Sequence, residues 1–159
     1  MSGVAALIEM TKATFEDEID VMKVSEDVYA GLDYLPSMYK TWVEEGEKED
    51  PRRFNFVVLI DSRVGGFFSL LFSQDKSTYI SSARRVAKQY RATGVGNKIA
   101  EFSKRFAKSL NRNVERLISF TDMWLEDVPL KRKIENEVTM ILITKIFLKL
   151  SNREEMLSS

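Results

Sequence analysis

Residues 77–110 read STYISSARRVAKQYRATGVGNKIAEFSKRFAKSL, and their pattern sets the expected architecture of the whole chain. Tyr79 to Val86 has the β-branched and aromatic composition of a strand. The residues after Gly96 have apolar side chains at helical spacing. Between the two lies Arg91-Ala-Thr-Gly94-Val-Gly96, an Arg-x-x-Gly-x-Gly sequence. This stretch therefore predicts a strand, a tight glycine turn and a long helix.

The predicted helix, residues 95–110, is strongly amphipathic. Lysine and arginine side chains occupy the positions around its apolar face. Five apolar side chains fall on one face and predict packing against a sheet: Val95, Ile99, Phe102, Phe106 and Leu110.

The glycine turn has the chemistry of a phosphate-binding site. Glycine at 94 and 96 permits backbone dihedrals closed to other residues and keeps side chains away. The first N–H groups of a helix have no partner within it, and the helix dipole is positive there. The sequence lacks both the Gly-Lys-Ser/Thr ending of a triphosphatase loop and the third small residue of a dinucleotide fingerprint. A compact turn without any ligand is the alternative. The candidate residues are Arg91, Ala92, Thr93, Gly94, Val95, Gly96 and Asn97.

Composition excludes several kinds of chemistry. The 159 residues suit one domain, with 44% apolar and 30% charged residues. The absence of Cys excludes disulfides and thiolate catalysis, and the absence of His removes the commonest general base and makes a zinc site improbable, so we expect no metal. Neither a membrane-length apolar run nor a signal-peptide pattern is present, so we expect a cytoplasmic protein without membrane contact.

The formal net charge of zero conceals an uneven distribution. Residues 1–50 have four basic and thirteen acidic side chains, a net charge of −9, whereas residues 84–116 have ten basic and two acidic ones, a net charge of +8. The positive charge gathered around the glycine turn would attract a polyanion. A nucleic acid is the least favoured partner, because aromatic residues are not interleaved with the basic ones. A solvated basic helix face is the other alternative.

The remaining pattern predicts an α/β fold in which a mixed, mostly antiparallel twisted sheet is flanked by helices. Thr14-x-x-Asp17 resembles a capping box at the start of a first helix, and Pro36 can begin a second. Gly65-Gly66 suggests a bulge. The predicted elements are strands at 4–10, 54–60, 64–72, 77–86 and 114–120, helices at 15–29 and from 36, an exposed acidic connection at 44–50, a short helix within 129–137, a terminal strand at 138–150 with a helix as its alternative, and a frayed tail at 153–159.

This order of elements resembles that of the GNAT acetyltransferase superfamily. Arg91 to Gly96 is similar to the superfamily's acyl-CoA motif, Gln/Arg-x-x-Gly-x-Gly/Ala. Tyr29 to Trp42, YAGLDYLPSMYKTW, resembles a segment of the histidine N-acetyltransferase family. The resemblance covers roughly residues 4–120. It implies a core at 1–120 and, because those relatives are longer, a divergent or truncated part at 121–159.

The resemblance implies acetyl-CoA as co-substrate and direct transfer of acetyl to the α-amine of a small amino acid, with histidine as the leading candidate. The backbone at Val86 would contact the pantetheine arm, and the amides of the glycine turn would hold the pyrophosphate. Asp33, Tyr34 and Tyr39 would face the amine acceptor. From the residues alone, Asp33 could equally cap the second helix, and the aromatic residues could form a packing surface rather than a pocket wall.

The sequence departs from this family at one chemical requirement. Many GNAT enzymes place a tyrosine near the leaving thiol, on the helix after the fifth strand. Residues 128–138 contain no tyrosine, and the last one in the chain is Tyr90. No catalytic residue is assigned. The alternative function is therefore a catalytically weak acyl-CoA-binding or regulatory domain.

Overall fold

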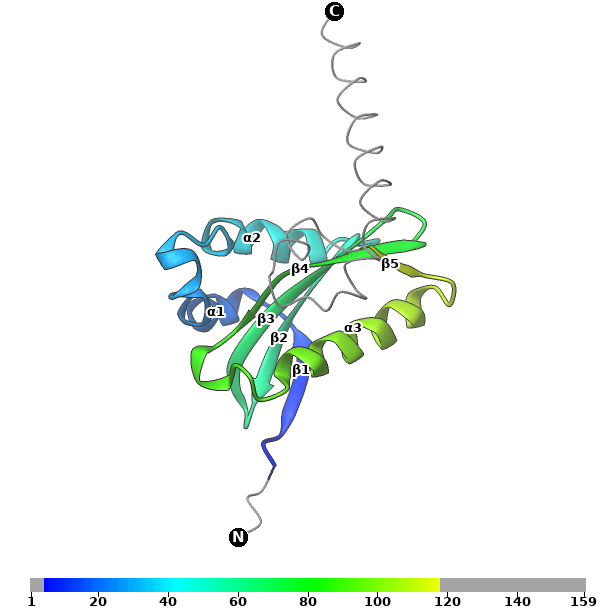
Figure 1. Cartoon of the computed structure of the whole chain (residues 1–159). Coiled ribbons are helices and arrows are strands. Elements are labelled where there is room, and N and C mark those ends of the chain that lie inside the picture. Colours follow the sequence, from blue (N-terminus) through cyan, green and yellow to red (C-terminus); the bar gives the residue numbers. More distant parts are fainter. Residues whose placement is uncertain (1–4, 118–159) are drawn as a thin grey trace, which may run out of the picture. The chain divides into compact units, whose positions relative to one another are not determined.

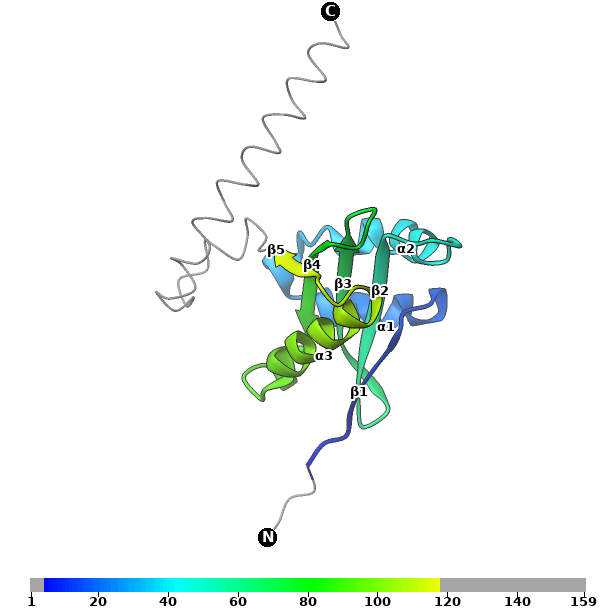
Figure 2. The same cartoon turned by 90° about the vertical axis from the view of Figure 1, so that its right-hand side faces the viewer.

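The computed structural model describes residues 5–117, which form a central sheet covered by helices on both faces (Figures 1 and 2). The sheet order is β1-β2-β3-β4-β5, and the first four strands are antiparallel neighbours. The strands are β1 (Ile8–Lys12), β2 (Arg53–Ile60), β3 (Arg63–Phe72), β4 (Thr78–Val86) and β5 (Glu115–Leu117). The helices are α1 (Glu18–Ser25), α2 (Leu35–Gly46) and α3 (Val95–Leu110), with 3-10 turns at Phe15–Asp17, Val28–Gly31 and Lys88–Tyr90.

Alternation along the strands divides the core into two layers, because successive side chains of a strand point to opposite faces. Helix α3 buries Val95, Ile99 and Ala107 against one face of the sheet. Helices α1 and α2 pack on the other face. The sheet contributes Phe56, Val58, Ile60, Phe68, Leu70 and Phe72 to the α3 side, and Val57, Phe67 and Ala83 to the α1–α2 side.

The predicted meander and the helix at 95–110 are confirmed. Strands β2, β3 and β4 follow one another as antiparallel neighbours. Gly65 is the extra residue of a bulge, because Val58 pairs with Gly66 while Leu59 pairs with Val64. Strand β5 joins the outer edge of β4, where the Glu115 N–H donates to the Ser77 carbonyl at 2.9 Å. The predicted mixed α/β fold is therefore confirmed.

Several predicted boundaries need correction. The helix expected at 15–29 is interrupted: α1 ends at Ser25, and the chain turns left-handed at Tyr29 and Ala30, with φ of +50° and +54°. Helix α2 continues to Gly46, so the start of the predicted acidic connection is helical. The capping box is present, because the Asp17 carboxylate accepts the Thr14 N–H at 2.8 Å. The first strand is displaced to 8–12, and the predictions for 118–159 lie outside the described residues.

The packing of α3 gives the first testable prediction. Ile99 is buried against the sheet, so Ile99→Ala should lower the free energy of unfolding by about 3 kcal/mol through lost burial and the cavity left behind. Lys104 lies on the exposed face of the same helix, and Lys104→Ala should change that free energy by less than about 0.5 kcal/mol. Urea unfolding followed by circular dichroism measures both variants. Equal losses would contradict the assigned face of α3.

Candidate functional site

The Arg-x-x-Gly-x-Gly turn joins the end of β4 to the start of α3. Gly94 precedes the helix with φ +90° and ψ 0°, a conformation that an L side chain rarely adopts. A Cβ atom built on Gly96 would meet no atom within 4 Å. The two glycines therefore have different roles: Gly94 permits the turn, and Gly96 leaves open space in the first turn of the helix.

Six consecutive backbone N–H groups of this turn make no hydrogen bond of good geometry to an acceptor within residues 5–117. They are the N–H groups of Ala92, Thr93, Gly94, Val95, Gly96 and Asn97. The Arg91 N–H differs, because it donates to the Lys88 carbonyl at 3.3 Å. Helix α3 has no side-chain cap and no acidic residue in its first turn, although both are common at helix starts. The described chain thus leaves the positive end of α3 unsatisfied.

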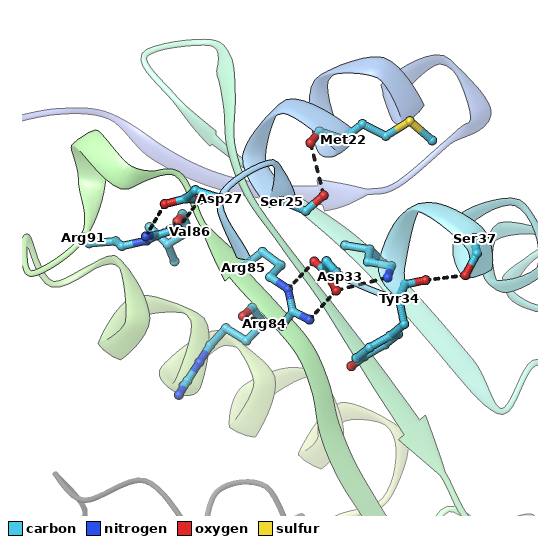
Figure 3. Close-up of polar contacts among 11 residues, drawn as sticks. Met22, Ser25, Asp27, Asp33, Tyr34, Ser37, Arg84, Arg85, Val86 and Arg91 are labelled. Carbon is cyan, nitrogen blue, oxygen red and sulfur yellow. Dashed lines mark hydrogen bonds and ion pairs between the residues drawn. The ribbon is translucent and has the colours of Figure 1, made fainter. Parts of the chain in front are cut away.

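The Arg91 side chain bonds to groups outside the turn, at Val86 and just beyond the end of α1. Its two terminal nitrogens donate to both Asp27 carboxylate oxygens at 2.8 Å, and its Nε donates to the Val86 carbonyl at 2.9 Å (Figure 3). Both charged side chains remain exposed. The hydrogen bonds from Arg91 hold the pKa of Asp27 below its ordinary value. The bond from Arg91 Nε occupies one lone pair of the Val86 carbonyl, a predicted cofactor contact. The second lone pair of that carbonyl can still accept a hydrogen bond.

A bulge interrupts β4 just before Val86. Phe67 pairs with Arg85 and Ser69 pairs with Ser82, so the two residues Ala83 and Arg84 oppose the single residue Phe68. Ala83 has a positive φ of +50°. At a bulge, backbone polar groups leave the ladder and can face a ligand. Sequence reasoning missed this feature, because no glycine or proline marks it.

Asp33 is engaged by a partner that the sequence did not indicate. Arg85 Nε and one terminal nitrogen of its guanidinium donate to the two Asp33 oxygens at 2.7 and 2.8 Å (Figure 3). The Arg85 and Asp33 side chains are only 8% and 2% exposed. Asp33 also accepts the Leu35 N–H at the start of α2, as the capping alternative predicted. In this conformation the carboxylate is therefore not open to an incoming ammonium group.

The same pair perturbs the titration of Asp33. Burial by itself raises the pKa of this carboxyl, but the hydrogen bonds from Arg85 and from the Leu35 N–H outweigh it and lower the pKa below its ordinary value. The charged form is therefore the one that the folded state stabilises.

The three tyrosines of the predicted acceptor segment lie in different environments. The rings of Tyr29 and Tyr34 lie 5.3 and 5.4 Å from the Arg85 guanidinium, and both side chains are exposed. Tyr39 is 1% exposed, and its hydroxyl donates to the Thr14 carbonyl at 2.7 Å. Burial raises the pKa of Tyr39 above its ordinary value. Tyr34 remains available to a ligand, whereas Tyr39 is a core residue and its expected place facing the acceptor needs correction.

A pocket of about 370 Å³ lies between α1 and the connection from β4 to α3. Its lining includes Lys23 and Asp27 from the α1 side and Lys88 and Gln89 from the connection. Asp27 therefore contacts both this pocket and the side chain of Arg91. Among the described residues, no helix has the length and apolar character needed to cross a membrane.

Comparison with known proteins gives two sets of relatives. The chain is 31% identical over 102 residues to a histidine N-acetyltransferase from Oreochromis niloticus and 29% identical over 111 residues to the probable N-acetyltransferase 16 of Homo sapiens. These matches cover 64% and 68% of this chain but only 29% and 28% of the relatives. The chain therefore spans less than a third of the length of these curated relatives. No protein-family model matches it.

Solved structures identify the fold. The PaiA N-acetyltransferase from Thermoplasma acidophilum, solved in complex with coenzyme A, matches with a TM-score of 0.53 at 17% identity over 65% of this chain and 73% of its own. A putative GNAT-family acetyltransferase from Desulfovibrio desulfuricans matches with a TM-score of 0.57 at 13% identity over 66% of this chain and 69% of its own. This domain has the GNAT fold. The predicted fold class and the predicted resemblance are both confirmed.

Within this domain, sequence reasoning found the glycine turn but missed Asp27 and Arg85. The available signal was the excess of acidic residues before residue 50 and of basic residues after residue 84. From the sequence alone, this charge imbalance predicts attraction of a polyanionic ligand to the basic region. Part of it is instead matched inside the protein, because Asp27 and Asp33 pair with Arg91 and Arg85.

The Asp33–Arg85 pair gives a stability prediction for this domain. Asp33→Asn keeps the size of the side chain but leaves the buried Arg85 charge unpaired, so it should lower the free energy of unfolding by about 3 kcal/mol. Asp20→Asn removes an exposed partner of Lys23 and should cost less than about 1 kcal/mol. Chemical unfolding at pH 7 measures both, and a small effect at Asp33 would show that the pair contributes little.

The same variant has a predicted dependence on pH. Because folding lowers the pKa of Asp33, its stabilising contribution is complete above the unfolded value of about 3.9 and is lost as pH falls through the lower folded value. The difference between wild type and Asp33→Asn should therefore shrink as pH falls below about 4. Unfolding curves at a series of pH values check this, and a constant difference would contradict it.

Proposed function

We propose that this domain binds acetyl-CoA at the Arg91–Asn97 turn and transfers the acetyl group to the α-amine of a small amino acid, with histidine as the first candidate. The observation that carries the proposal is the row of six backbone N–H groups, residues 92–97, that have no acceptor within the described chain. Such donors at a helix N-terminus suit an anionic diphosphate.

The residues of the turn fit a phosphate-bearing cofactor. The site needs open space, donors and positive potential. Gly96 leaves the space, and the turn provides the donors. Lys98 is exposed just beyond them and adds positive charge where the helix dipole is already positive. A lysine there disfavours the free helix but favours a bound anion. The coenzyme A in the complex of the PaiA N-acetyltransferase, which shares the fold, supports the same assignment.

Attack of an amine on a thioester has three requirements: a neutral amine, a donor for the developing oxyanion and a proton for the leaving thiolate. We assign the second to backbone N–H groups at the β4 bulge, residues 83–84, beside the proposed pantetheine contact at Val86. The third has no assigned residue, because no tyrosine follows Tyr90 in the sequence. Alignment of the two reactants supplies much of the remaining rate enhancement.

Histidine is proposed as the acceptor because of the curated relatives, which are histidine N-acetyltransferases 29–31% identical to this chain. The exposed rings of Tyr29 and Tyr34, which lie 5.3 and 5.4 Å from the Arg85 guanidinium, are compatible with an aromatic imidazole. We therefore assign contact with the acceptor to these tyrosines and not to Asp33, because both oxygens of Asp33 are bonded to Arg85.

One observation favours a second function, an acyl-CoA-binding domain with weak or no turnover. Residues 128–138, where the family resemblance places a tyrosine near the thiol, contain no tyrosine. Such a domain would bind the cofactor through the same turn, so binding and turnover must be measured separately.

Gly96→Asp tests cofactor binding directly. The new side chain enters open space at a helix start, where an acidic residue is favourable, so the fold should be retained. Its negative charge should weaken CoA binding at least about 100-fold, since repulsion replaces attraction at close range. Gly96→Asn is the matched neutral control and should bind more tightly than the aspartate variant. Isothermal titration calorimetry measures both, and unchanged affinity in Gly96→Asp would refute the phosphate site.

Acetyl transfer is tested by the release of free thiol from acetyl-CoA in the presence of different amino acids. The enzyme proposal expects histidine to accelerate release above the rate with acetyl-CoA alone, and Nα-acetylhistidine, with its α-amine blocked, to leave it unchanged. Mass spectrometry of the product identifies the acylated nitrogen. Tight CoA binding without thiol release for any amine would instead support the binding domain.

A further inference from the structure

Residues 27–34 are held at both ends by arginines that come from much later in the chain. Asp27 pairs with Arg91, 64 residues away, and Asp33 pairs with Arg85, 52 residues away (Figure 3). Arg85 lies in β4, and Arg91 begins the glycine turn. We call residues 27–34 the pinned loop. It contains Tyr29 and Tyr34, which the proposed function places near the acceptor.

The pinned loop depends on these anchors because little else stabilises its backbone. Tyr29 and Ala30 have left-handed dihedrals, and each such residue costs about 1 kcal/mol or more relative to ordinary conformations. None of the residues 28–31 is buried, and Leu32 is exposed. The hydrophobic effect therefore contributes little. The buried Arg85–Asp33 pair is the firm anchor of the loop, and the exposed Arg91–Asp27 pair is its second, weaker one.

The geometry of Arg91 indicates that its side chain holds the loop rather than a ligand. A bidentate fork on a carboxylate is the strongest arrangement available to a guanidinium, and the Nε bond to Val86 fixes the side chain at the end of β4. Its donors to Asp27 lie on the α1 side, where Asp27 lines the 370 Å³ pocket. The backbone of the residues that follow provides the unsatisfied N–H groups of the turn.

We infer that Arg91 and Asp27 are positioning residues that couple the cofactor turn to the pinned loop. This inference rests on the proposed function for the identity of the ligand. A diphosphate that orders residues 92–97 also fixes the backbone from which the Arg91 side chain projects. The entropic cost of holding the fork on Asp27 then falls, and the loop becomes more ordered. By linkage, an acceptor that orders the loop tightens cofactor binding by the same factor.

Hydrogen exchange with and without CoA tests this coupling and requires no turnover. In the wild-type protein, CoA should slow exchange in peptides covering 92–98 and, at least about fivefold, in peptides covering 28–34. Asp27→Asn removes the charge that grips Arg91 but keeps the shape of the side chain. In that variant CoA should still slow exchange at 92–98, while the slowing at 28–34 should be lost. Asp20→Asn removes an exposed carboxylate of helix α1, whose ion pair in the described chain is with Lys23, and as the control it should behave as wild type.

The outcomes separate this inference from the proposed function. Absence of protection at 92–98 in the wild-type protein would refute the cofactor site itself. Protection at 92–98 with no change at 28–34, or with equal slowing at 28–34 in wild type and Asp27→Asn, would refute the coupling alone. Faster exchange at 28–34 on adding CoA would also refute it, because it would show that Arg91 leaves Asp27 for the diphosphate.

Discussion

The arrangement of this domain depends on one extra residue in β4. Side chains alternate between the two faces of a strand, so an insertion of one residue moves everything beyond it to the opposite face. Tyr79 packs on the α3 side, and regular alternation would send Arg85 to that side too. The bulge at 83–84 reverses this. Arg85 reaches Asp33 on the α1–α2 side, and Val86 packs toward α3.

The two arginine–aspartate pairs that follow from this geometry do different physical work. Arg85–Asp33 is almost fully buried, where separating the charges leaves an expensive unpaired ion. Arg91–Asp27 is exposed, where an ion pair contributes little to the stability of the fold. The first pair therefore fixes the position of the pinned loop, and the second is weak enough to respond to what binds at the turn. Coupling between the turn and the pinned loop requires an exposed, weak contact such as Arg91–Asp27, because a weak contact can change when a ligand binds.

The sequence predicted the features that depend on local pattern. Helix α3, the glycine turn and the bulge at Gly65 all have signals within a few residues, and each lies where it was expected. The Arg85–Asp33 pair could not be predicted, because it requires a bulge with no glycine and a contact across 52 residues. The burial of Tyr39 could not be predicted for a related reason, because aromatic composition does not distinguish a pocket wall from a core. Its hydroxyl donates to the Thr14 carbonyl, 25 residues away, and this long-range contact has no signal in the local sequence.

The first helical turns after β1 and the start of α3 differ in their capping residues, and this contrast is an argument about ligands. Thr14, Asp17 and Glu18 supply a capping box and negative charge where the first helical turns begin. Helix α3 begins with no side-chain cap, no acidic residue and a nearby lysine. A side-chain cap or an acidic residue in the first turn of α3 would stabilise the free helix. The exposed N–H groups at this helix start are open to water in the free domain, and they become hydrogen-bond donors to an anion when one binds there.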